Sequence, residues 1–429
     1  MNEHVAVVDL GYGDAGKGTV VDALCASAPV RAVLRFNGGA QAAHNVIHDD
    51  GRHHTFAQFG SGTLRGVPTH LTRFMVVDPL ALAAEAAALG NPFSLLTVDE
   101  DALLATPWHR AANQRREAAR GSGRHGSCGM GVGEVMAYAL SHPSAPRVGD
   151  VRSRSVLRRR LAEVAAFFDN ADIFLDDVVE AFLAFGRAVQ IVDGSHVDRL
   201  LADGPCVFEG AQGVLLDEWR GWHPHTTWST TTFDNVAELC PSFRRLGVVR
   251  TYTTRHGAGP FVTADESLAL PEAHNGRGEW QGAFRVGHFD AVAHRYAVTV
   301  AGGVDELAVT HLDAAAATPA LGVCTSYDLD GVPWSTISPG PFRDLAYQQG
   351  LTALLDRARP GDVHRPDSFA DEIGSLLGAP VAIESWGPRA ADKRFTDTFR
   401  WSGRRCSAPS PAGYRSSART ARPAWHLQR

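Results

Sequence analysis

The sequence lacks the cysteine spacing of a metal or redox site. Its six cysteines are scattered along the chain, and no two stand at the separation of zinc ligands or of a CxxC motif. Reduced thiols are the simplest interpretation of this pattern. We therefore expect a cytoplasmic protein.

Long apolar runs and an excess of one charge are also missing. No apolar run approaches the roughly 18 residues that a membrane-spanning helix needs. Asp9 interrupts the first run, so the N-terminus has no signal-peptide pattern. The net charge of −6 gives no support for a nucleic-acid or membrane partner. The length of 429 residues allows one large domain or two or three smaller ones, and we find no internal repeat.

What the sequence does have is a glycine-rich turn near its start. The apolar run Val5–Leu10 predicts a buried strand, and helical spacing resumes at Val20. The glycines between them are Gly11, Gly13, Gly16 and Gly18. Such a strand, turn and helix can cradle an anion, to which Lys17 adds positive charge. Asp14 would repel phosphate unless it holds a metal ion or a proton, so it is the first candidate for chemistry. A tight turn with an N-cap aspartate is the alternative, because the GxxxxGK[ST] pattern is not met.

A second turn of small residues carries a histidine. The stretch Arg31–Phe36 predicts a short strand, and Asn37–Asn45 (NGGAQAAHN) follows it. The ordinary pKa of histidine suits proton donation near neutrality, so His44 is a candidate general acid. Because the chain holds 19 histidines, a structural loop histidine is the alternative.

Further predicted strands end in polar or glycine-rich turns. Cys206–Glu209 places Glu209 and Gln212 where α/β sheets present ligands. The other predicted strands are Val248–Thr254, Val304–Leu312 and Val381–Glu384. Helices are predicted after Asp78-Pro79 and at Trp108–Arg120, Val156–Phe168 and Val178–Val192. This alternation predicts a mainly parallel sheet with ligands at the C-terminal edge of its strands. Gly121–Gly133, with six glycines, is either a ligand-binding loop or a flexible linker.

These motifs, in this order, resemble those of the adenylosuccinate synthetase family. GDAGKG, FEGAQG and RHGAGPF together form a very specific combination, and the matching stretches span residues 13 to 388. The stretches are Gly13–Gly18, Asn37–His44, Val76–Leu82, Arg116–Gly121, Arg147–Asp150, Phe208–Asp217, Thr254–Phe261, Thr310–Asp313 and Ser385–Pro388. The resemblance implies an α/β fold of the adenylosuccinate synthetase type. Its central β-sheet would be mainly parallel, flanked by helices and P-loop-NTPase-like, in a catalytic domain of residues 1–401.

The resemblance also implies a two-step reaction that needs Mg²⁺ and uses GTP as co-substrate. GTP would phosphorylate the 6-oxygen of IMP, and the amine of L-aspartate would then displace phosphate and form a C–N bond. Asp14 would remove the proton from N1 of the purine and bind Mg²⁺ together with the carbonyl of Ala43. His44 would act as the acid at the 6-oxygen, Lys17 would neutralise phosphate charge, and Gln212 would touch the purine or ribose.

The family's binding positions can be carried over residue by residue. Those implied for GTP are Gly13, Gly16, Lys17, Gly18, Ala43, Asn45, Arg285, His311, Asp313, Ser385, Gly387 and Pro388. Those implied for IMP are Asp14, Asn37, Gln41, His44, Cys128, Arg147, Gln212, Thr227, His256 and Gly257. Arg147 would reach the IMP phosphate in the other subunit of a homodimer.

The chain departs from the family at several of these positions. Ala15 and Ala43 replace the usual Glu and Gly, and His256 replaces an aliphatic residue. The phosphate-binding Thr-Thr-Gly-Arg is Ser127-Cys128-Gly129-Met130 here, which weakens one donor and removes one positive charge. His311 stands in place of a Lys in the guanine motif, which leaves the choice between GTP and ATP open.

The largest departure lies in the segment that grips the carboxylates of aspartate. The family has a run of arginines there, whereas Asn275–Asp290 offers a different set: Arg277, Trp280, Gln281, Gly282 and Arg285. Trp280 and Phe284 cannot hold carboxylates as bidentate arginines do. Either another segment supplies the charge, or the amine partner is less acidic than aspartate.

Three functions are therefore open. The first is the family's reaction on IMP or a close analogue, and the second is a specialised paralogue with a different amine or purine. The third is a catalytically weak nucleotide-binding paralogue, although such a binder would need no acid–base pair. The Arg/Ser/Pro-rich stretch 402–429 is expected to be a disordered tail, with a nucleic-acid arm as the alternative.

Overall fold

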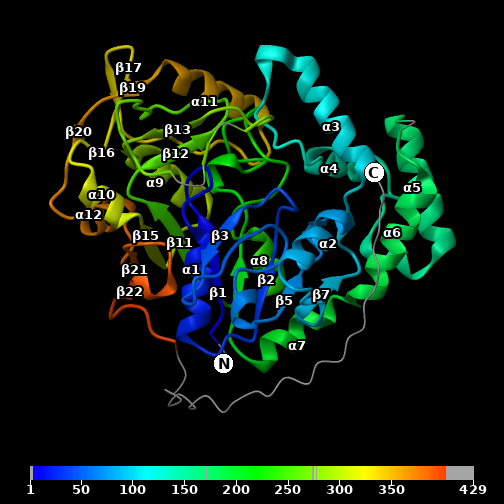
Figure 1. The fold of residues 1–429 in the computed structure, drawn as a ribbon. Coiled ribbons are helices and arrows are strands. Elements are labelled where there is room, and N and C mark those ends of the chain that lie inside the picture. The colour runs from blue at the N-terminus through cyan, green and yellow to red at the C-terminus, as the bar shows by residue number, and fades with distance from the viewer. Residues whose placement is uncertain (1–2, 171, 273–274, 277, 402–429) are drawn as a thin grey trace.

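A ten-stranded sheet crosses the computed structural model, which describes residues 3–170, 172–272, 275–276 and 278–401 (Figure 1). The strand order is β22-β21-β15-β11-β1-β10-β2-β5-β7-β9. In that order the strands are Lys393–Phe395, Val381–Ser385, Glu306–Thr310, Arg244–Arg250, Val5–Asp9, Cys206–Glu209, Ala32–Arg35, Thr69–Leu71, Leu96–Asp99 and Gln190–Val192. All neighbouring pairs are parallel except β21 and β22. The predicted mainly parallel α/β fold is confirmed.

Both faces of the sheet are buried at its centre, as the side chains of β1 show. Ala6 and Val8 point into one apolar core, while Val5 and Val7 point into another on the opposite face. Strands covered on both sides need apolar residues at every position, which is why this strand reads as a continuous apolar run. A third core lies among α2, α3, α5 and α6.

Twelve α-helices, found among the described residues, flank the sheet. They are α1 Lys17–Ser27, α2 Pro79–Ala88, α3 Pro107–Arg120, α4 Val132–Ser141, α5 Arg154–Phe168, α6 Leu175–Ala188, α7 Ser195–Asp203, α8 Asp234–Leu239, α9 Ala291–Val300, α10 Leu312–Ala317, α11 Leu345–Arg357 and α12 Phe369–Leu377. In Figure 1 the group α3 to α6 lies on the side opposite β21 and β22. In the part of the chain that the structure describes, no helix combines the length and apolar character needed to cross a membrane.

Short antiparallel ribbons lie outside the main sheet and carry site residues. β3 (His44–Ile47) pairs with β4 (His53–Phe56), and β12 (Thr253–His256) pairs with β13 (Phe284–Gly287). The second ribbon brings the segment Asn275–Asp290, predicted to bind the amine and called the amine segment below, beside the turn that follows β12.

The structure corrects two predicted elements. The strand predicted at 248–254 is split, because the chain turns between β11 and β12. The helix predicted at 178–192 ends at Ala188, and its last residues form the edge strand β9, whose Ile191 and Val192 suit a strand. The predicted tail, residues 402–429, lies outside the described residues.

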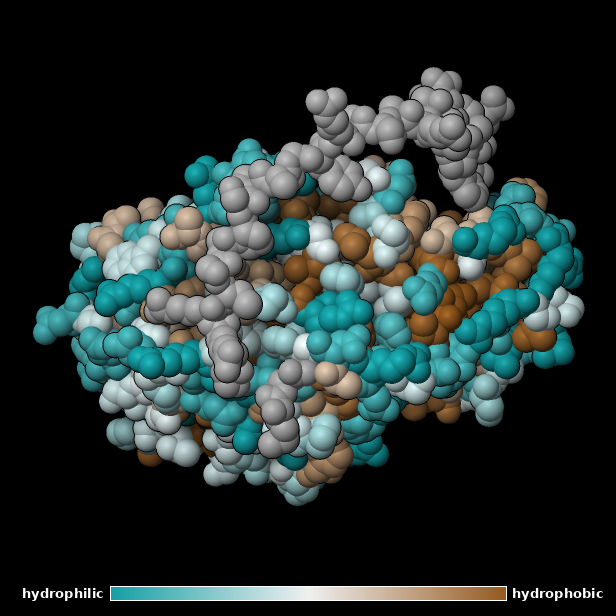
Figure 2. Space-filling model, turned by 90° about the horizontal axis from the view of Figure 1, so that it is seen from below, coloured by the Kyte–Doolittle hydropathy of each residue, from teal (hydrophilic) through white to brown (hydrophobic). Residues whose placement is uncertain are grey.

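The surface is mixed in character. Figure 2 shows one face, on which an area of hydrophobic residues lies between hydrophilic ones. Large apolar side chains that are at least 40% exposed are Leu80, Leu140, Phe167, Phe174, Trp228, Val332, Phe342 and Trp386.

Candidate active site

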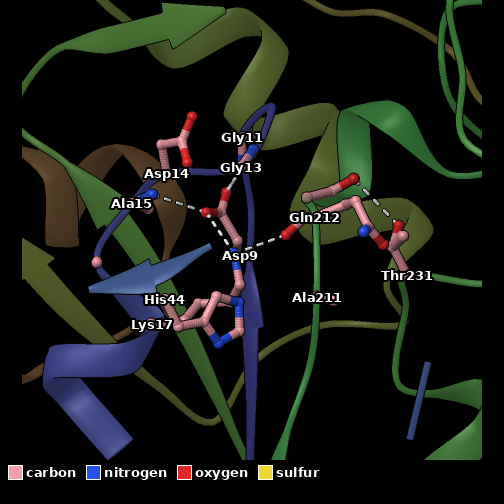
Figure 3. A network of polar contacts seen from close by, with 12 residues as sticks. Asp9, Gly11, Gly13, Asp14, Ala15, Lys17, His44, Ala211, Gln212 and Thr231 are labelled. Atoms are coloured by element: carbon pink, nitrogen blue, oxygen red, sulfur yellow. Dashed lines mark hydrogen bonds and ion pairs between the residues drawn. The ribbon is translucent and has the colours of Figure 1, made fainter. Parts of the chain in front are cut away.

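The loop after β1 is folded around the buried carboxylate of Asp9. Its Oδ1 accepts hydrogen bonds from the backbone N–H groups of Gly11 (2.8 Å) and Gly13 (3.3 Å), and its Oδ2 accepts one from Ala15 (2.9 Å). Lys17 Nζ lies 3.0 Å from Asp9 Oδ2 and donates to the carbonyl of Gln212 at 2.7 Å (Figure 3). Asp9 therefore shapes the predicted anion cradle and balances the charge of Lys17. This role of Asp9 was not predicted from the sequence.

Asp14 lies at the tip of this loop and contacts His256. Its φ of 59° is left-handed, a conformation that aspartate tolerates better than most residues. Its Oδ2 is 3.2 Å from Nε2 of His256, at the end of β12. Burial alone would raise the pKa of Asp14, but the hydrogen bond and charge of His256, with Lys17 and Arg250, lower it overall. Burial opposes protonation of His256, yet Asp14 raises its pKa. Asp14 is thus held as a carboxylate.

The residues predicted to hold Mg²⁺ have suitable chemistry. Asp14 is 31% exposed at its side chain, and Ala43 is exposed on the turn before His44. No group of three or more His, Cys, Asp or Glu side chains among the described residues is placed to hold a metal. Mg²⁺ needs no such cluster, because it usually takes one or two carboxylates together with phosphates and waters. The Asp14 carboxylate and the Ala43 carbonyl fit that donor set.

His44, at the start of β3, is paired with Glu209 at the end of β10. His44 Nδ1 lies 2.6 Å from Glu209 Oε1. Glu209 also accepts from the backbone N–H of Ser61 (2.9 Å) and from its hydroxyl. Burial would raise the pKa of Glu209, but His44, Arg35 and Ser61 lower it to about 2.

The ionised state of Glu209 fixes the orientation of the His44 proton. A carboxylate can only accept, so Nδ1 carries a proton and Nε2 is left for a substrate. Burial lowers the pKa of His44 overall, although the hydrogen bond and charge of Glu209 act in the opposite direction. Gly18 permits this arrangement, since a Cβ there would lie 2.8 Å from the Cβ of His44.

Amide side chains gather around the turn after β10. The side chain of Asn37 pairs in both directions with the backbone of Ala211, at 2.7 and 3.0 Å. Asn37 therefore holds the turn in place. Gln212 has a left-handed φ of 57°, and its Oε1 is buried without a hydrogen-bond partner among the described residues. Oε1 and Nε2 of Gln41 are also buried and have no hydrogen-bond partner among the described residues. Buried amides without partners are expected where a ligand binds.

A second glycine-rich loop, residues 121–131, is ordered by α3. The fully buried Glu117 accepts from the backbone N–H groups of Ser127 (3.0 Å) and His125 (3.4 Å) and lies 3.2 Å from Arg120. The Ser127 hydroxyl donates to Asn113 at 2.8 Å. These bonds favour the ligand-loop interpretation over a flexible linker. Burial raises the pKa of Cys128, so its thiol is neutral.

The amine segment packs between this loop and the turn after β12. The Trp280 ring lies against Gly129, and the Gln281 carbonyl lies so close to Gly257 that a Cβ there would be 2.3 Å from it. Gly282, with a left-handed φ of 88°, ends the turn. Arg285 Nη2 donates to the carbonyls of Gly257 (2.7 Å) and Gly259 (2.9 Å). The predicted residue Arg277 lies outside the described residues.

The predicted guanine motif is assembled at two neighbouring strand ends. His311 and Asp313 follow β15, and Ser385, Gly387 and Pro388 follow or end β21, its parallel neighbour. A cavity of about 610 Å³ is lined by Leu312 and Trp386, which stand next to these residues in the chain. Asp313 is exposed in the first turn of α10.

The charge at this motif comes from a residue that the sequence analysis missed. Burial lowers the pKa of His311 well below its ordinary value, so His311 is neutral. Lys393 Nζ donates to the carbonyls of Gly387 (2.6 Å) and Arg389 (3.1 Å). Burial lowers the pKa of Lys393 to about 8.

Three predicted residues make their contacts elsewhere. Asn45 Oδ1 accepts from Thr55 (2.6 Å) within the β3–β4 ribbon. Thr227 is half-buried, and its backbone N–H donates to the carbonyl of Leu216. Arg147 is exposed and donates to the carbonyl of Asp101. A role for these three with substrate stays a prediction.

Comparison with known proteins bears on the whole arrangement. A sequence model of the adenylosuccinate synthetase family matches residues 6–349. The chain is 30% identical to adenylosuccinate synthetase of Bdellovibrio bacteriovorus, over 90% of this chain and 96% of that one. It is 33% identical to the Frankia alni protein of the same name, with the same coverage.

Two solved structures share the fold. Fully ligated adenylosuccinate synthetase from Plasmodium falciparum has a TM-score of 0.78 and 18% identity, over 92% of this chain and 100% of that one. Succinoaminodeoxyadenylate synthetase of cyanophage S-2L, bound to dGMP and to dATP as an energy donor, has a TM-score of 0.61 and 20% identity, over 92% and 96%. On the family match and the relatives at 30% identity or more, this chain belongs to the adenylosuccinate synthetase family.

Proposed function

We propose that this protein is a GTP-dependent ligase acting on the 6-oxygen of IMP or a close purine nucleotide analogue. It would phosphorylate that oxygen and then form a C–N bond with the amine of L-aspartate. One observation carries the proposal: two residues suited to act as base and acid lie beside the predicted phosphate cradle, and each is held by its own partner residue. Asp14 is held ionised by His256, and His44 is oriented by Glu209.

In the first step the purine oxygen becomes a nucleophile. Asp14 takes the proton from N1, which moves electron density onto the 6-oxygen. That oxygen attacks the γ-phosphorus of GTP, the bond to the β-phosphate oxygen breaks, and GDP leaves. Burial lowers the pKa of His44, so Nε2 would gain its proton only as the negative charge of the phosphates enters the site; it would then donate to the 6-oxygen, while Lys17 offsets phosphate charge. Bound Mg²⁺ would supply further neutralisation of the phosphates.

In the second step the amine replaces the phosphorylated oxygen. The nitrogen attacks C6, the C6–O bond breaks, and phosphate leaves with the original 6-oxygen. One amine proton is released. The unpartnered amides of Gln41 and Gln212 would meet the nucleotide, and Cys128 and Thr227 its phosphate.

Recognition of GTP and dimer formation belong to the same proposal. Asp313 would accept two N–H bonds from the guanine edge, beside the backbone that Lys393 holds. Arg147 would cross to the substrate of the partner subunit in a homodimer, and its exposure supports this role. The catalytic domain would comprise residues 1–401.

A second candidate is a specialised paralogue with another amine or purine. It is favoured by Arg285, whose Nη2 is engaged by two carbonyls, and by Trp280, an aromatic residue in the segment where the family has carboxylate-binding arginines. The cyanophage relative, with its deoxynucleotides, is a protein of this fold that handles a different purine pair.

Phosphate release by the purified protein with Mg²⁺, GTP and IMP, with and without L-aspartate, tests both candidates. Release that requires IMP and aspartate supports the first. Release that requires IMP but is indifferent to aspartate supports the second. Tight GTP binding without release under any purine would overturn both and favour a non-catalytic nucleotide-binding paralogue.

A further inference from the structure

We infer that Arg124 binds a carboxylate of the amine substrate and that Trp280 is the platform that positions it. The inference rests on the proposed function and specifies its second substrate as an amine that carries a carboxylate. The amine segment lacks the family's run of arginines, and Arg124 would supply the positive charge in their place.

Arg285 cannot take this role with its full guanidinium. Its Nη2 donates to two backbone carbonyls, and the guanidinium lies 5.5 Å from the ring centroid of Phe261. These contacts brace the turn after β12. Burial also lowers the pKa of Arg285. Arg285 Nε is also buried without a partner among the described residues, but Nη2 already donates to two carbonyls, so a carboxylate cannot use the Nε and Nη2 pair. Arg285 therefore has a structural role in the turn after β12.

Arg124 comes from the second glycine-rich loop and meets the amine segment. Its Nη1 donates to the carbonyl of Glu279 at 3.1 Å, and its guanidinium carbon lies 5.7 Å from the ring centroid of Trp280. Within the described ranges no carboxylate lies within 4.0 Å of it, whereas Arg116 pairs with Glu134 and Arg120 with Glu117. Its Nε is buried and lacks a hydrogen-bond partner among those residues.

These contacts leave most of the Arg124 donors free. A guanidinium has five N–H donors in a planar fork that matches a carboxylate. One donor is taken by Glu279, and the buried Nε is costly to leave unpaired. A bound carboxylate would satisfy Nε and Nη2 together, which is the bidentate geometry that arginine favours.

Trp280 is fixed in the place that this role requires. A Cβ at Gly129 would lie 2.8 Å from ring atom Cδ1 of Trp280, so the ring packs closely against the loop. Gly126 lies beside Gly257 and the Gln281 carbonyl, which joins the loop to the amine segment. The loop that carries Ser127 and Cys128 thus also presents Arg124. The lost arginines of one segment are replaced by a cation from another.

Steady-state kinetics of R124A with matched amines tests the inference. We would compare β-alanine with propylamine, which has the same chain length but no carboxylate, at saturating GTP and IMP. In R124A the KM for the carboxylate-bearing amine should rise at least tenfold. The KM values for GTP and IMP and the kcat at saturating amine should stay within about threefold of wild type. R124K should recover part of the loss, and W280A should show a smaller rise in the same KM.

The control is R158A, which removes an exposed arginine of α5 that pairs with Asp176. It should match wild type in every constant, and circular dichroism should show that all variants are folded. An unchanged amine KM in R124A, or a wild-type preference for propylamine over β-alanine, would overturn the inference while purine-dependent phosphate release still upheld the proposed function. Wild-type protein that releases no phosphate with any purine would overturn both.

Discussion

Two glycine-rich loops of this protein are each folded around a buried carboxylate, and they differ in what they present. Asp9 gathers three backbone N–H groups and Lys17, and its loop carries Asp14. Glu117 gathers two N–H groups, and its loop carries Cys128, Met130 and Arg124. The first loop keeps Asp14 and Lys17, which the proposed phosphoryl chemistry uses, although Ala15 stands where the family has Glu. The second carries Cys128 and Met130 at positions where the family resemblance implies phosphate-binding residues. Under the proposed function, activation and acceptor recognition would therefore rest on separate loops, and one could change without the other.

Removing the base of the first loop should have the largest effect. Asp14→Asn keeps the shape and tolerates the left-handed backbone, but it cannot take the N1 proton. We expect turnover to fall by about 10²- to 10⁴-fold with GTP affinity nearly unchanged. Phosphate release and calorimetric GTP titration measure the two quantities. Unchanged turnover would remove Asp14 from the mechanism.

The proposed acid, His44, should lose activity when its partner Glu209 is changed. Glu209→Gln leaves His44 without the charge that stabilises its protonated form, so kcat should drop by about 100-fold. Ser61→Ala, which deletes only the hydroxyl contact to Glu209, is the matched control and should lose much less. Equal losses in the two variants would show that the pair acts through packing alone.

A matched pair of substitutions separates the two loops. Asp9→Asn should raise the KM for GTP by about tenfold or more and destabilise the protein by ~3 kcal/mol, because it breaks a buried ion pair. Glu117→Gln should raise the KM for IMP and for the amine while leaving that for GTP near wild type. Kinetics in each substrate and urea unfolding provide the readouts. If either variant altered all three KM values alike, the loops would not be independent.

The smallest effect on activity is expected at Asp290, which caps the N-terminus of α9. Burial raises its pKa to about 6 from 3.8. The folded protein therefore gains stability from a proton on Asp290 that is fully present below pH 3.8 and lost as pH rises through 6, about 3 kcal/mol in all. Asp290→Asn keeps the cap to Ala293 and should remove this component. Urea unfolding between pH 4 and 7 compares the two proteins, and identical pH profiles would contradict the assignment.

Residues at strand ends could be predicted from the sequence. Asp14, His44 and Gln212 stand in turns of small residues after apolar runs, and the structure places all three around the end of β1. The predicted strands at 5–10, 31–36 and 206–209 correspond to β1, β2 and β10. These strands can be recognised from a short stretch of sequence, because every side chain in them is buried and the stretch is therefore mainly apolar.

Partners separated in sequence could not be predicted this way. His44 and Glu209 are 165 residues apart, and Arg124 meets Trp280 only because two loops pack together. Strands β5, β7 and β9 have three or four residues, too few for a periodic pattern. Asp9 and Glu117 did leave a signal, a carboxylate just before a glycine-rich turn. That pattern alone does not show whether the turn folds back onto the carboxylate.

The most direct test of the account follows the 6-oxygen itself. IMP labelled with ¹⁸O at that position would be incubated with Mg²⁺, GTP and a carboxylate-bearing amine, and the released phosphate analysed by mass spectrometry. The account predicts that one labelled oxygen appears in each phosphate and that the amount matches the new C–N product. Unlabelled phosphate would mean simple hydrolysis of GTP. It would contradict the claim that this protein phosphorylates the 6-oxygen of the purine.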